Sequence, residues 1–289
     1  MGFVRFCGEG RGKAPTLTTK PFNIMTASLN ERVIWITGAS SGIGAAAAGA
    51  LARAGARVVL TARRAERLRA VAEPLGASAV VVAADLAATG ERVRAFTAAQ
   101  TAFGRIDVLV NNAGIGRLGW LEELDEARIA AQLALNLEAT IHLSRMALPA
   151  MLARRSGQIV TVASIAGLIA PPTYSIYSAT KFAVRGFAEA LRREVGPRGV
   201  SVSLVSPGAV RDTEWAAGAG IARRSGITTP GWLALSSEQV ADAIVGVIRR
   251  PRAEIVMPWP LAVAALVNGL APGLVDALIT QAFTRRERP

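Results

Sequence analysis

The chain has 289 residues, of which 51% are hydrophobic and 19% are charged, so it can bury a core and is not expected to be disordered. Its formal net charge is +12, but only 5% of its residues are aromatic. Nucleic-acid binders usually concentrate basic charge with aromatic residues between, so we expect no nucleic-acid partner. The single cysteine, Cys7, can form no internal disulfide and fits no zinc or redox spacing, which favours a cytoplasmic protein without a metal site.

The first 24 residues precede the first strand-like run and are predicted to be a flexible extension ahead of Met25. They contain no apolar run of signal-peptide length, so we do not expect secretion. The globular part of the chain is therefore expected to start near residue 25.

Seven short apolar runs alternate with longer helical patterns along the rest of the chain. The runs are rich in β-branched residues and apolar on both faces, as expected for strands that helices cover on each side. This alternation predicts an α/β fold with a single Rossmann-type doubly wound parallel sheet of about seven strands and helices on both faces. Residues 25–257 would form this dinucleotide-binding and catalytic domain, with ligands beyond the carboxyl ends of the strands. The expected strands cover residues 33–37, 57–62, 78–85, 106–112, 157–164, 200–206 and 253–257.

The first expected strand runs directly into the glycine-rich stretch TGASSGIG, residues 37–44. Its glycines allow a tight turn and a close approach of the backbone to a pyrophosphate, and the following helix points its N-terminal amides at that charge. An ordinary loop is the alternative, but a position between a strand and a helix favours a dinucleotide site. The residues expected to border the cofactor here are Thr37, Gly38, Ser40, Ser41, Gly42, Ile43 and Gly44.

The second expected strand ends in TARR, which places Arg63 19 residues after Gly44. In dinucleotide-binding folds a residue roughly 20 positions on contacts the adenosine ribose. An acidic residue there would bind the 2′-hydroxyl of NAD, whereas a guanidinium favours the 2′-phosphate of NADP through charge-assisted hydrogen bonds. The sequence therefore favours NADP (NADPH) over NAD, unless Arg63 is simply a surface arginine of an Arg-rich chain.

Further motifs follow in order, and the whole set resembles the short-chain dehydrogenase/reductase (SDR) family. Besides the glycine turn, the set comprises ADL (84–86), NNAG (111–114), Asn136, Ser164, YSATK (177–181) and PGAVRDT (207–213). Order and spacing are family-like from about residue 31 to 257, including the 13 positions from Ser164 to Tyr177. The resemblance implies an oxidoreductase that transfers a hydride between NADP(H) and a carbonyl or secondary alcohol.

Tyr177 and Lys181 stand four residues apart and therefore share one face of a helix. Lys181 is the only lysine after the N-terminal extension, since the other two are Lys13 and Lys20. A free tyrosine has a pKa of about 10, and a neighbouring ammonium is expected to lower it so that the phenol can act as general acid and base. Arginine is bulkier and planar and is not equivalent in this role. Ser164 would stabilise charge on the substrate oxygen while Tyr177 delivers the proton.

The resemblance also implies roles that the residue types alone do not reveal. It implies that Asn136 helps to hold a water between Lys181 and solvent, which gives the catalytic set Asn136, Ser164, Tyr177 and Lys181. It implies cofactor contacts by Asp85, Leu86, Asn112, Ala113, Gly114, Tyr177, Lys181, Pro207, Gly208, Val210 and Thr213. The family usually has a threonine five residues after the proline, where this chain has Asp212, and Thr213 at six is kept as the candidate.

Simpler interpretations exist for some of these residues. Tyr177 could be a buried helix tyrosine and Ser164 a strand-end hydroxyl, although the complete set of motifs disfavours both. The only histidine, His142, is expected to be a packing or interface residue, because the mechanism needs no imidazole.

Two segments follow the last motif. Residues 212–233 are rich in Gly and Ala with Trp215 and Trp232, and they are either a mobile flap over a hydrophobic substrate or a plain loop. Residues 258–289 are predicted to be an apolar helical segment with a basic tail, packed on the same domain. Gly, Pro, Asn and Asp residues interrupt this segment, so a lid or a subunit contact is favoured over a membrane anchor, with peripheral membrane contact as the alternative.

Three functions are consistent with these motifs. An NADP-dependent carbonyl reductase or alcohol dehydrogenase leads, followed by a 3-oxoacyl-carrier reductase and by a catalytically silent NADP-binding regulator. The intact Ser164, Tyr177 and Lys181 set disfavours the regulator, because a sensor needs no proton relay. The expected partners are a small-molecule carbonyl or alcohol and, by resemblance, further copies in a homodimer or homotetramer that uses the helices with Asn136 and Lys181.

Overall fold

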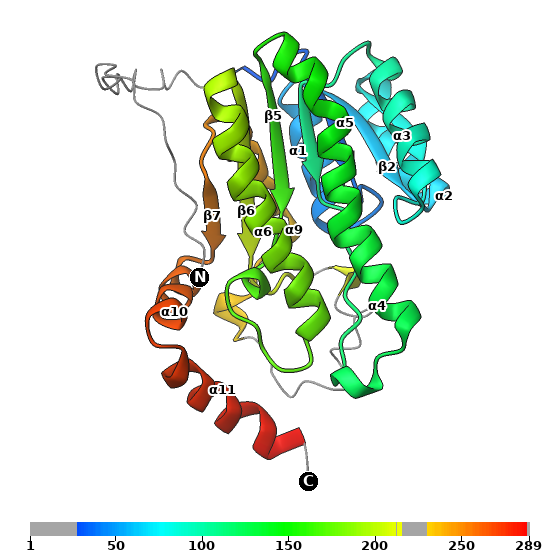
Figure 1. Cartoon of the computed structure of the whole chain (residues 1–289). Coiled ribbons are helices and arrows are strands. Elements are labelled where there is room, and N and C mark those ends of the chain that lie inside the picture. The colour runs from blue at the N-terminus through cyan, green and yellow to red at the C-terminus, as the bar shows by residue number, and fades with distance from the viewer. Residues whose placement is uncertain (1–27, 212, 216–229, 288–289) are drawn as a thin grey trace, which may run out of the picture.

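The computed structural model describes residues 28–211, 213–215 and 230–287 (Figure 1). Within these residues, seven strands form one parallel sheet, as the sequence predicts. The strand order is β3-β2-β1-β4-β5-β6-β7. The strands are β1 (Val33–Thr37), β2 (Arg57–Ala62), β3 (Ala79–Ala83), β4 (Val108–Asn111), β5 (Gly157–Val162), β6 (Val200–Pro207) and β7 (Glu254–Met257). The expected extension at residues 1–24 and most of the segment at 212–233 lie outside the described residues.

Helices connect the strands and continue past the last one. The α-helices are α1 (Gly42–Arg53), α2 (Ala65–Ala72), α3 (Thr89–Ala102), α4 (Glu126–Gln132), α5 (Ala139–Ala153), α6 (Ser175–Val195), α9 (Ser237–Arg249), α10 (Trp259–Leu270) and α11 (Pro272–Glu287). The shorter elements are η1 (Glu73–Ser78), η2 (Leu121–Glu123), the π-helix η3 (Leu133–Glu138), η4 (Ile165–Gly167), η5 (Gly196–Arg198) and η6 (Gly231–Leu233). Local sequence sets some of their starts: Ser236 and Gln239 form a reciprocal capping box at the start of α9.

Alternation along the strands produces two apolar layers, one on each face of the sheet. Ile34 and Ile36 of β1 pack on one face with α1 and α9, and Val33 and Trp35 pack on the other with α3, α5 and α6. Because successive strand residues point to opposite faces, both layers need apolar residues from the same strand. The uninterrupted apolar runs of the sequence therefore form the centre of a three-layer α/β/α fold (Figure 1).

The sheet order reverses between β1 and β4, which pair directly in the register Ile34↔Val108, Trp35↔Leu109 and Ile36↔Val110. Parallel strands end at the same edge of a sheet, so the glycine turn after β1 and the NNAG turn after β4 start side by side. This reversal is the place where open α/β sheets bind their ligands.

The helices after β7 extend beyond the carboxyl edge of the sheet (Figure 1). α10 contacts the domain: Leu261 lies against Gly208, and Asn268 Nδ2 donates to the Leu168 carbonyl at 3.2 Å. No single helix in the described part of the chain is long and apolar enough to cross a membrane. α10 and α11 would satisfy that requirement together, but they are bent by 116° at the break between them.

Candidate active site

The glycine turn after β1 has the geometry of a close backbone approach. Gly38 and Gly42 have φ angles of +67° and +54°, which favour glycine. A Cβ on Gly44 would lie 2.3 Å from the Gly38 carbonyl oxygen, so the turn closes only without a side chain there. α1 then starts with no acidic residue in its first turn and no side-chain cap from Ser41. Its first amides and positive dipole end therefore suit a pyrophosphate, and the turn fits the expected dinucleotide.

The NNAG turn after β4 is fastened to the glycine turn by hydrogen bonds. The buried Thr37 hydroxyl accepts from the backbone amides of Asn112 and Ala113, both at 3.0 Å, and donates to the Val110 carbonyl at 3.2 Å. In return, Asn112 Nδ2 donates to the carbonyls of Thr37 at 2.9 Å and Gly38 at 3.2 Å. These hydrogen bonds consequently hold the two turns together where the sheet order reverses, between β1 and β4.

The same NNAG turn reaches the residues that the resemblance calls catalytic. A Cβ on Gly114 would lie 3.3 Å from Asn136 Oδ1 and 3.8 Å from Lys181 Nζ. The Asn136 side chain accepts from the Ile115 amide at 2.8 Å and donates to the Ile115 carbonyl at 2.9 Å and to Thr180 Oγ1 at 3.2 Å. Since both of its donors and one acceptor position bind protein atoms, this side chain positions the turn against α6. A water held by Asn136 stays a prediction.

Ser164, Tyr177 and Lys181 meet beyond the carboxyl end of β5. The Ser164 hydroxyl lies close enough to the Tyr177 phenol to act on its pKa, and Ser164 Oγ accepts from the Ala166 amide at 3.1 Å. Lys181 Nζ donates to the Val162 carbonyl at 2.9 Å and lies 5.6 Å from the centre of the Tyr177 ring. Tyr177 and Lys181 are both buried on the same face of α6. A hydroxyl, a phenol and an ammonium can thus act on one small group.

The expected direction of the Tyr177 pKa shift is wrong for this structure. Burial raises the pKa of Tyr177 above its ordinary value, and the nearby Ser164 hydroxyl, which acts in the other direction, has the smaller effect. Burial also lowers the pKa of Lys181 to about 8. The physical reason is that both groups lie in a desolvated site, where each charged form is disfavoured. The Lys181 ammonium also donates to the Val162 carbonyl.

Aromatic rings surround the Tyr177 phenol. Trp215 lies with its ring centre 5.0 Å from that of Tyr177, and Tyr174 makes an edge contact at 6.1 Å. Burial raises the pKa of Tyr174, which keeps it neutral. The wall of the site next to the reacting group is therefore apolar and aromatic.

The segment after β6 lies over the glycine turn. Pro207 pairs with Met257 at the ends of β6 and β7, Gly208 N donates to the Met257 carbonyl at 2.7 Å, and Val210 bridges to Leu235. Thr213 Oγ1 donates to the Val210 carbonyl at 3.2 Å, and its methyl carbon would lie 3.1 Å from a Cβ on Gly42. Thr213 therefore lies at the glycine turn despite its unusual spacing. Asp212 lies outside the described residues.

Arg64, rather than Arg63, contacts the glycine turn. Arg63 is exposed, whereas Arg64 Nη2 donates to the hydroxyls of Ser40 and Ser41, both at 3.1 Å. Glu214 forms ion pairs with Arg64, at 2.6 Å, and with Arg67. The sequence predicts a cofactor contact only for Arg63, the first arginine of the pair. The adjacent arginines at the end of β2 were the available signal, because a turn after a strand can direct either side chain to the ligand.

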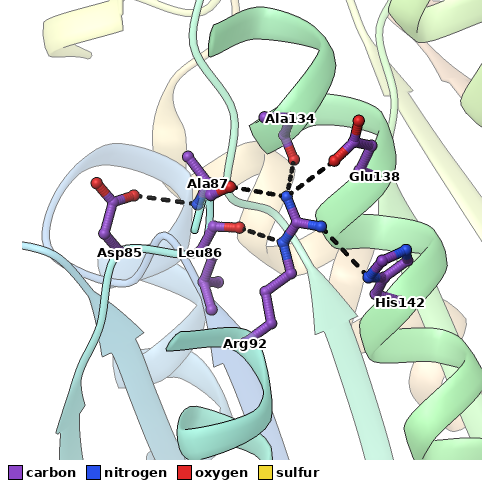
Figure 2. A network of polar contacts seen from close by, with 7 residues as sticks. All are labelled: Asp85, Leu86, Ala87, Arg92, Ala134, Glu138 and His142. Atoms are coloured by element: carbon purple, nitrogen blue, oxygen red, sulfur yellow. Dashed lines mark hydrogen bonds and ion pairs between the residues drawn. The ribbon is translucent and has the colours of Figure 1, made fainter. Parts of the chain in front are cut away.

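Arg92 is a second residue that the sequence analysis missed (Figure 2). Its side chain is only 1% exposed, although it is charged. It donates to the carbonyls of Leu86 at 2.6 Å, Ala87 at 2.9 Å and Ala134 at 2.9 Å, and it pairs with Glu138 at 3.2 Å. Arg92 on α3 thereby joins the turn at Asp85 and Leu86, which is expected to contact the cofactor, to the π-helix that contains Asn136.

His142 completes this network. Its Nδ1 lies 3.3 Å from Arg92 Nη1, and because a guanidinium can only donate, Nδ1 is the acceptor in this contact. The turn itself is tightened by Asp85, whose Oδ1 accepts from the Ala87 amide at 3.0 Å (Figure 2). The expected packing role of His142 agrees with this contact, and Arg92 is the residue that the histidine supports.

Replacing Arg92 with methionine is expected to destabilise the fold and to loosen the turn at Leu86 and Ala87 and its connection to the π-helix η3. The change removes the donor of three carbonyls, and each one that stays buried without a partner costs about 1–3 kcal/mol. Urea unfolding measures this cost. The exposed Arg94→Met on the same helix is the control, and we expect it to unfold close to the wild-type urea midpoint. An equal loss in both variants would show that the Arg92 network does not stabilise the fold.

Comparisons with known proteins find relatives of one family. The sequence profile of the short chain dehydrogenase family matches residues 32–222. The dehydrogenase/reductase SDR family member 7B of Bos taurus is 33% identical over 91% of this chain and 85% of its own length. A metagenomic short-chain oxidoreductase solved with NADP has a TM-score of 0.67 at 34% identity, covering 80% of this chain and 97% of that one. A short chain dehydrogenase/reductase from Burkholderia phymatum solved with NAD has a TM-score of 0.77 at 28% identity, covering 86% and 96%.

Proposed function

The chain belongs to the short-chain dehydrogenase/reductase family of oxidoreductases, and on that premise we propose that it is an NADP-dependent carbonyl reductase or alcohol dehydrogenase for a hydrophobic substrate. One observation supports this proposal most strongly. The turn from Asn112 to Ile115 touches the glycine turn on one side and Lys181 and Asn136 on the other. A cofactor on the glycine turn would thus have the Ser164, Tyr177 and Lys181 cluster beside it.

The residues of the cluster divide the chemistry of carbonyl reduction between them. A bound nicotinamide cofactor would supply the hydride for the carbonyl carbon. The Ser164 hydroxyl would donate a hydrogen bond to the carbonyl oxygen as negative charge builds there. Because burial raises the pKa of Tyr177, its phenol is protonated at neutral pH and would deliver the proton to that oxygen.

Lys181 would act on the phenol rather than on the substrate. With a pKa of about 8, its side chain is mostly an ammonium at neutral pH. Once Tyr177 has lost its proton, this nearby positive charge would stabilise the phenolate. Asn136 keeps the turn at Ile115 in place beside these groups. Oxidation of an alcohol would use the same residues in reverse.

The aromatic wall supports a hydrophobic substrate. Trp215 and Tyr174 lie next to the Tyr177 ring and offer apolar surface to whatever group flanks the reacting carbon. Aromatic side chains bury large apolar areas and so favour ligands that leave water readily. We therefore propose ketones or secondary alcohols with sizeable apolar substituents as the substrate class.

The arginines at the end of β2 support NADP. Arg64 already donates to Ser40 and Ser41 in the glycine turn, and Arg63 is exposed beside it. A 2′-phosphate near this turn would receive charge-assisted hydrogen bonds that the 2′-hydroxyl of NAD cannot match. Arg64 joins Arg63 as a proposed contact of the adenosine ribose.

The double variant Arg63→Ala/Arg64→Ala tests this preference. Hydrogen bonds to charged groups contribute about 1.5–3 kcal/mol, so we expect NADPH binding to weaken by about one to two orders of magnitude while NADH binding changes little. Fluorescence titration with both cofactors measures the two affinities. Arg69→Ala, at an exposed position of α2, the helix that follows the two arginines, should alter neither affinity. If the wild-type protein binds NADH as tightly as NADPH, the arginines do not select the cofactor.

A further inference from the structure

Seven large apolar side chains are exposed along α10 and along α11 up to Gln281, the part of α11 whose side chains the structure describes. On α10, Trp259, Val263, Leu266 and Leu270 follow each other at intervals of four, three and four residues, which places them on one face of the helix. The exposed fractions of Trp259, Leu266 and Leu270 are 75%, 63% and 78%. Val267 adjoins this row, and Leu274 and Leu278 are exposed on α11, after the bend of 116°. We call these seven residues the apolar stripe: Trp259, Val263, Leu266, Val267, Leu270, Leu274 and Leu278.

The rest of the protein already contacts other residues of α10. Leu261 lies against Gly208, next to Pro207 of the candidate cofactor site, and Asn268 Nδ2 donates to the carbonyl of Leu168, four residues after Ser164. These contacts hold α10 at the carboxyl edge of the sheet, the edge that also carries the candidate active site (Figure 1). The apolar stripe is therefore presented outward from a fixed place near that site.

The composition around the stripe is that of a segment in contact with lipid. From Trp259 to Leu278 the one charged residue is Asp276, whereas 19% charged residues across the chain would give about four in a stretch of that length. Trp259 stands at the start of the stripe, and Arg285 and Arg286 follow Leu278 by seven and eight residues. Tryptophan at one end and basic residues at the other are typical of helices that lie in a membrane interface.

The length of α10 and the bend between α10 and α11 determine whether this segment could span a bilayer or lie at its interface. At 12 residues α10 is about 18 Å long, too short for a hydrocarbon core of about 30 Å. The bend of 116° between α10 and α11 excludes one straight span. Both helices can instead lie in the plane of the interface with the stripe immersed. The net charge of +12 adds attraction to a surface of anionic headgroups.

We propose that the apolar stripe docks this protein on an anionic lipid surface. Docking buries the stripe among acyl chains and leaves the basic end of α11 at the headgroups. It also sets the candidate active site close to the lipid, so a lipophilic carbonyl or alcohol dissolved in the membrane is the substrate class that this arrangement favours. This statement about the substrate rests on the proposed function, whereas the docking does not.

Sedimentation with vesicles tests the docking. The full chain is expected to pellet with vesicles of phosphatidylcholine and phosphatidylglycerol, and to pellet less with phosphatidylcholine alone. Leu266→Asp should lower the partition coefficient about tenfold or more, because burying a leucine side chain contributes about 1.5–3 kcal/mol. Val93→Asp is the matched control, since Val93 is also apolar and 54% exposed but lies on α3. It should bind vesicles like the wild-type protein.

Two results would overturn the docking. The first is a wild-type protein that stays in the supernatant, or a Leu266→Asp variant that pellets equally. The second is an oligomer that Leu266→Asp dissociates in analytical ultracentrifugation without any vesicle binding by the wild type, which would assign the stripe to a second copy of the chain. NADPH oxidation with a panel of hydrophobic ketones, offered without vesicles, is measured alongside. Docking without such activity would refute the proposed function alone, and activity without docking would refute this inference alone.

Discussion

Replacing Tyr177 with phenylalanine is expected to lower kcat for NADPH-dependent ketone reduction by about two to four orders of magnitude, the usual contribution of general acid–base catalysis. The phenol is the protein's proton donor in the proposed reaction, and phenylalanine keeps the ring while removing that proton. The affinity for NADPH should change little, because the glycine turn and the arginines after β2 are untouched. Steady-state kinetics and a cofactor titration measure the two quantities.

Tyr174→Phe is the matched control for this prediction. Tyr174 is the only other tyrosine of the chain, and its ring lies 6.1 Å from that of Tyr177. Its proposed role is to form part of the apolar wall, which phenylalanine preserves, so kcat should stay close to the wild-type value. If Tyr177→Phe reduces ketones at the wild-type rate, or if both variants lose activity equally, Tyr177 is not the proton donor.

Lys181→Arg is expected to abolish most activity although it conserves the charge. Lys181 Nζ fits between the Val162 carbonyl and the Tyr177 ring in a buried site, and the larger planar guanidinium cannot take that place without moving α6 or β5. We expect kcat to fall by about two orders of magnitude or more. Lys181→Met keeps the length of the side chain and removes the charge, so it separates the loss of the ammonium from a loss of fit.

The pH dependence of the wild-type enzyme checks the same residue. Lys181 is charged below its pKa of about 8 and neutral above it. Because the ammonium stabilises the phenolate that forms when Tyr177 gives up its proton, the rate of reduction should fall as the pH rises through about 8. In Lys181→Met the remaining activity should lack this decline. A wild-type rate that is constant from neutral pH to well above 8, or unimpaired turnover by Lys181→Arg, would contradict the role of the ammonium.

The fold could be predicted almost completely because each strand is a local apolar run. The small differences are at the strand ends, where polar residues begin to act. β5 was expected to reach residue 164 but ends at Val162, and Ser164 instead caps the short helix η4. β3 was expected to reach residue 85 but ends at Ala83, and Asp85 binds the Ala87 amide in the following turn. At both places a polar side chain binds a backbone amide, and this local hydrogen bond competes with the strand-to-strand hydrogen bonds of the sheet.

The parts of the site that could not be predicted depend on contacts between distant residues. Arg92 looks like any helix arginine in the sequence, and only the fold shows that it binds carbonyls 42 residues away at Ala134. The Arg64–Glu214 pair joins residues 150 positions apart. The pKa shift of Tyr177 was predicted in the wrong direction because the sequence shows a neighbouring lysine but not the depth of burial. Burial is a property of the packed structure.

The central claim is that Ser164, Tyr177 and Lys181 reduce a carbonyl with a hydride from NADPH bound at the glycine turn. Incubation of the wild-type protein with NADPH and a panel of hydrophobic ketones, some offered free and some on an acyl carrier, tests it most directly. The account predicts NADPH oxidation with at least one free ketone and an equal amount of the matching secondary alcohol. Tight NADPH binding without turnover of any ketone would contradict it and favour a silent regulator, and turnover restricted to carrier-bound substrates would favour a 3-oxoacyl-carrier reductase.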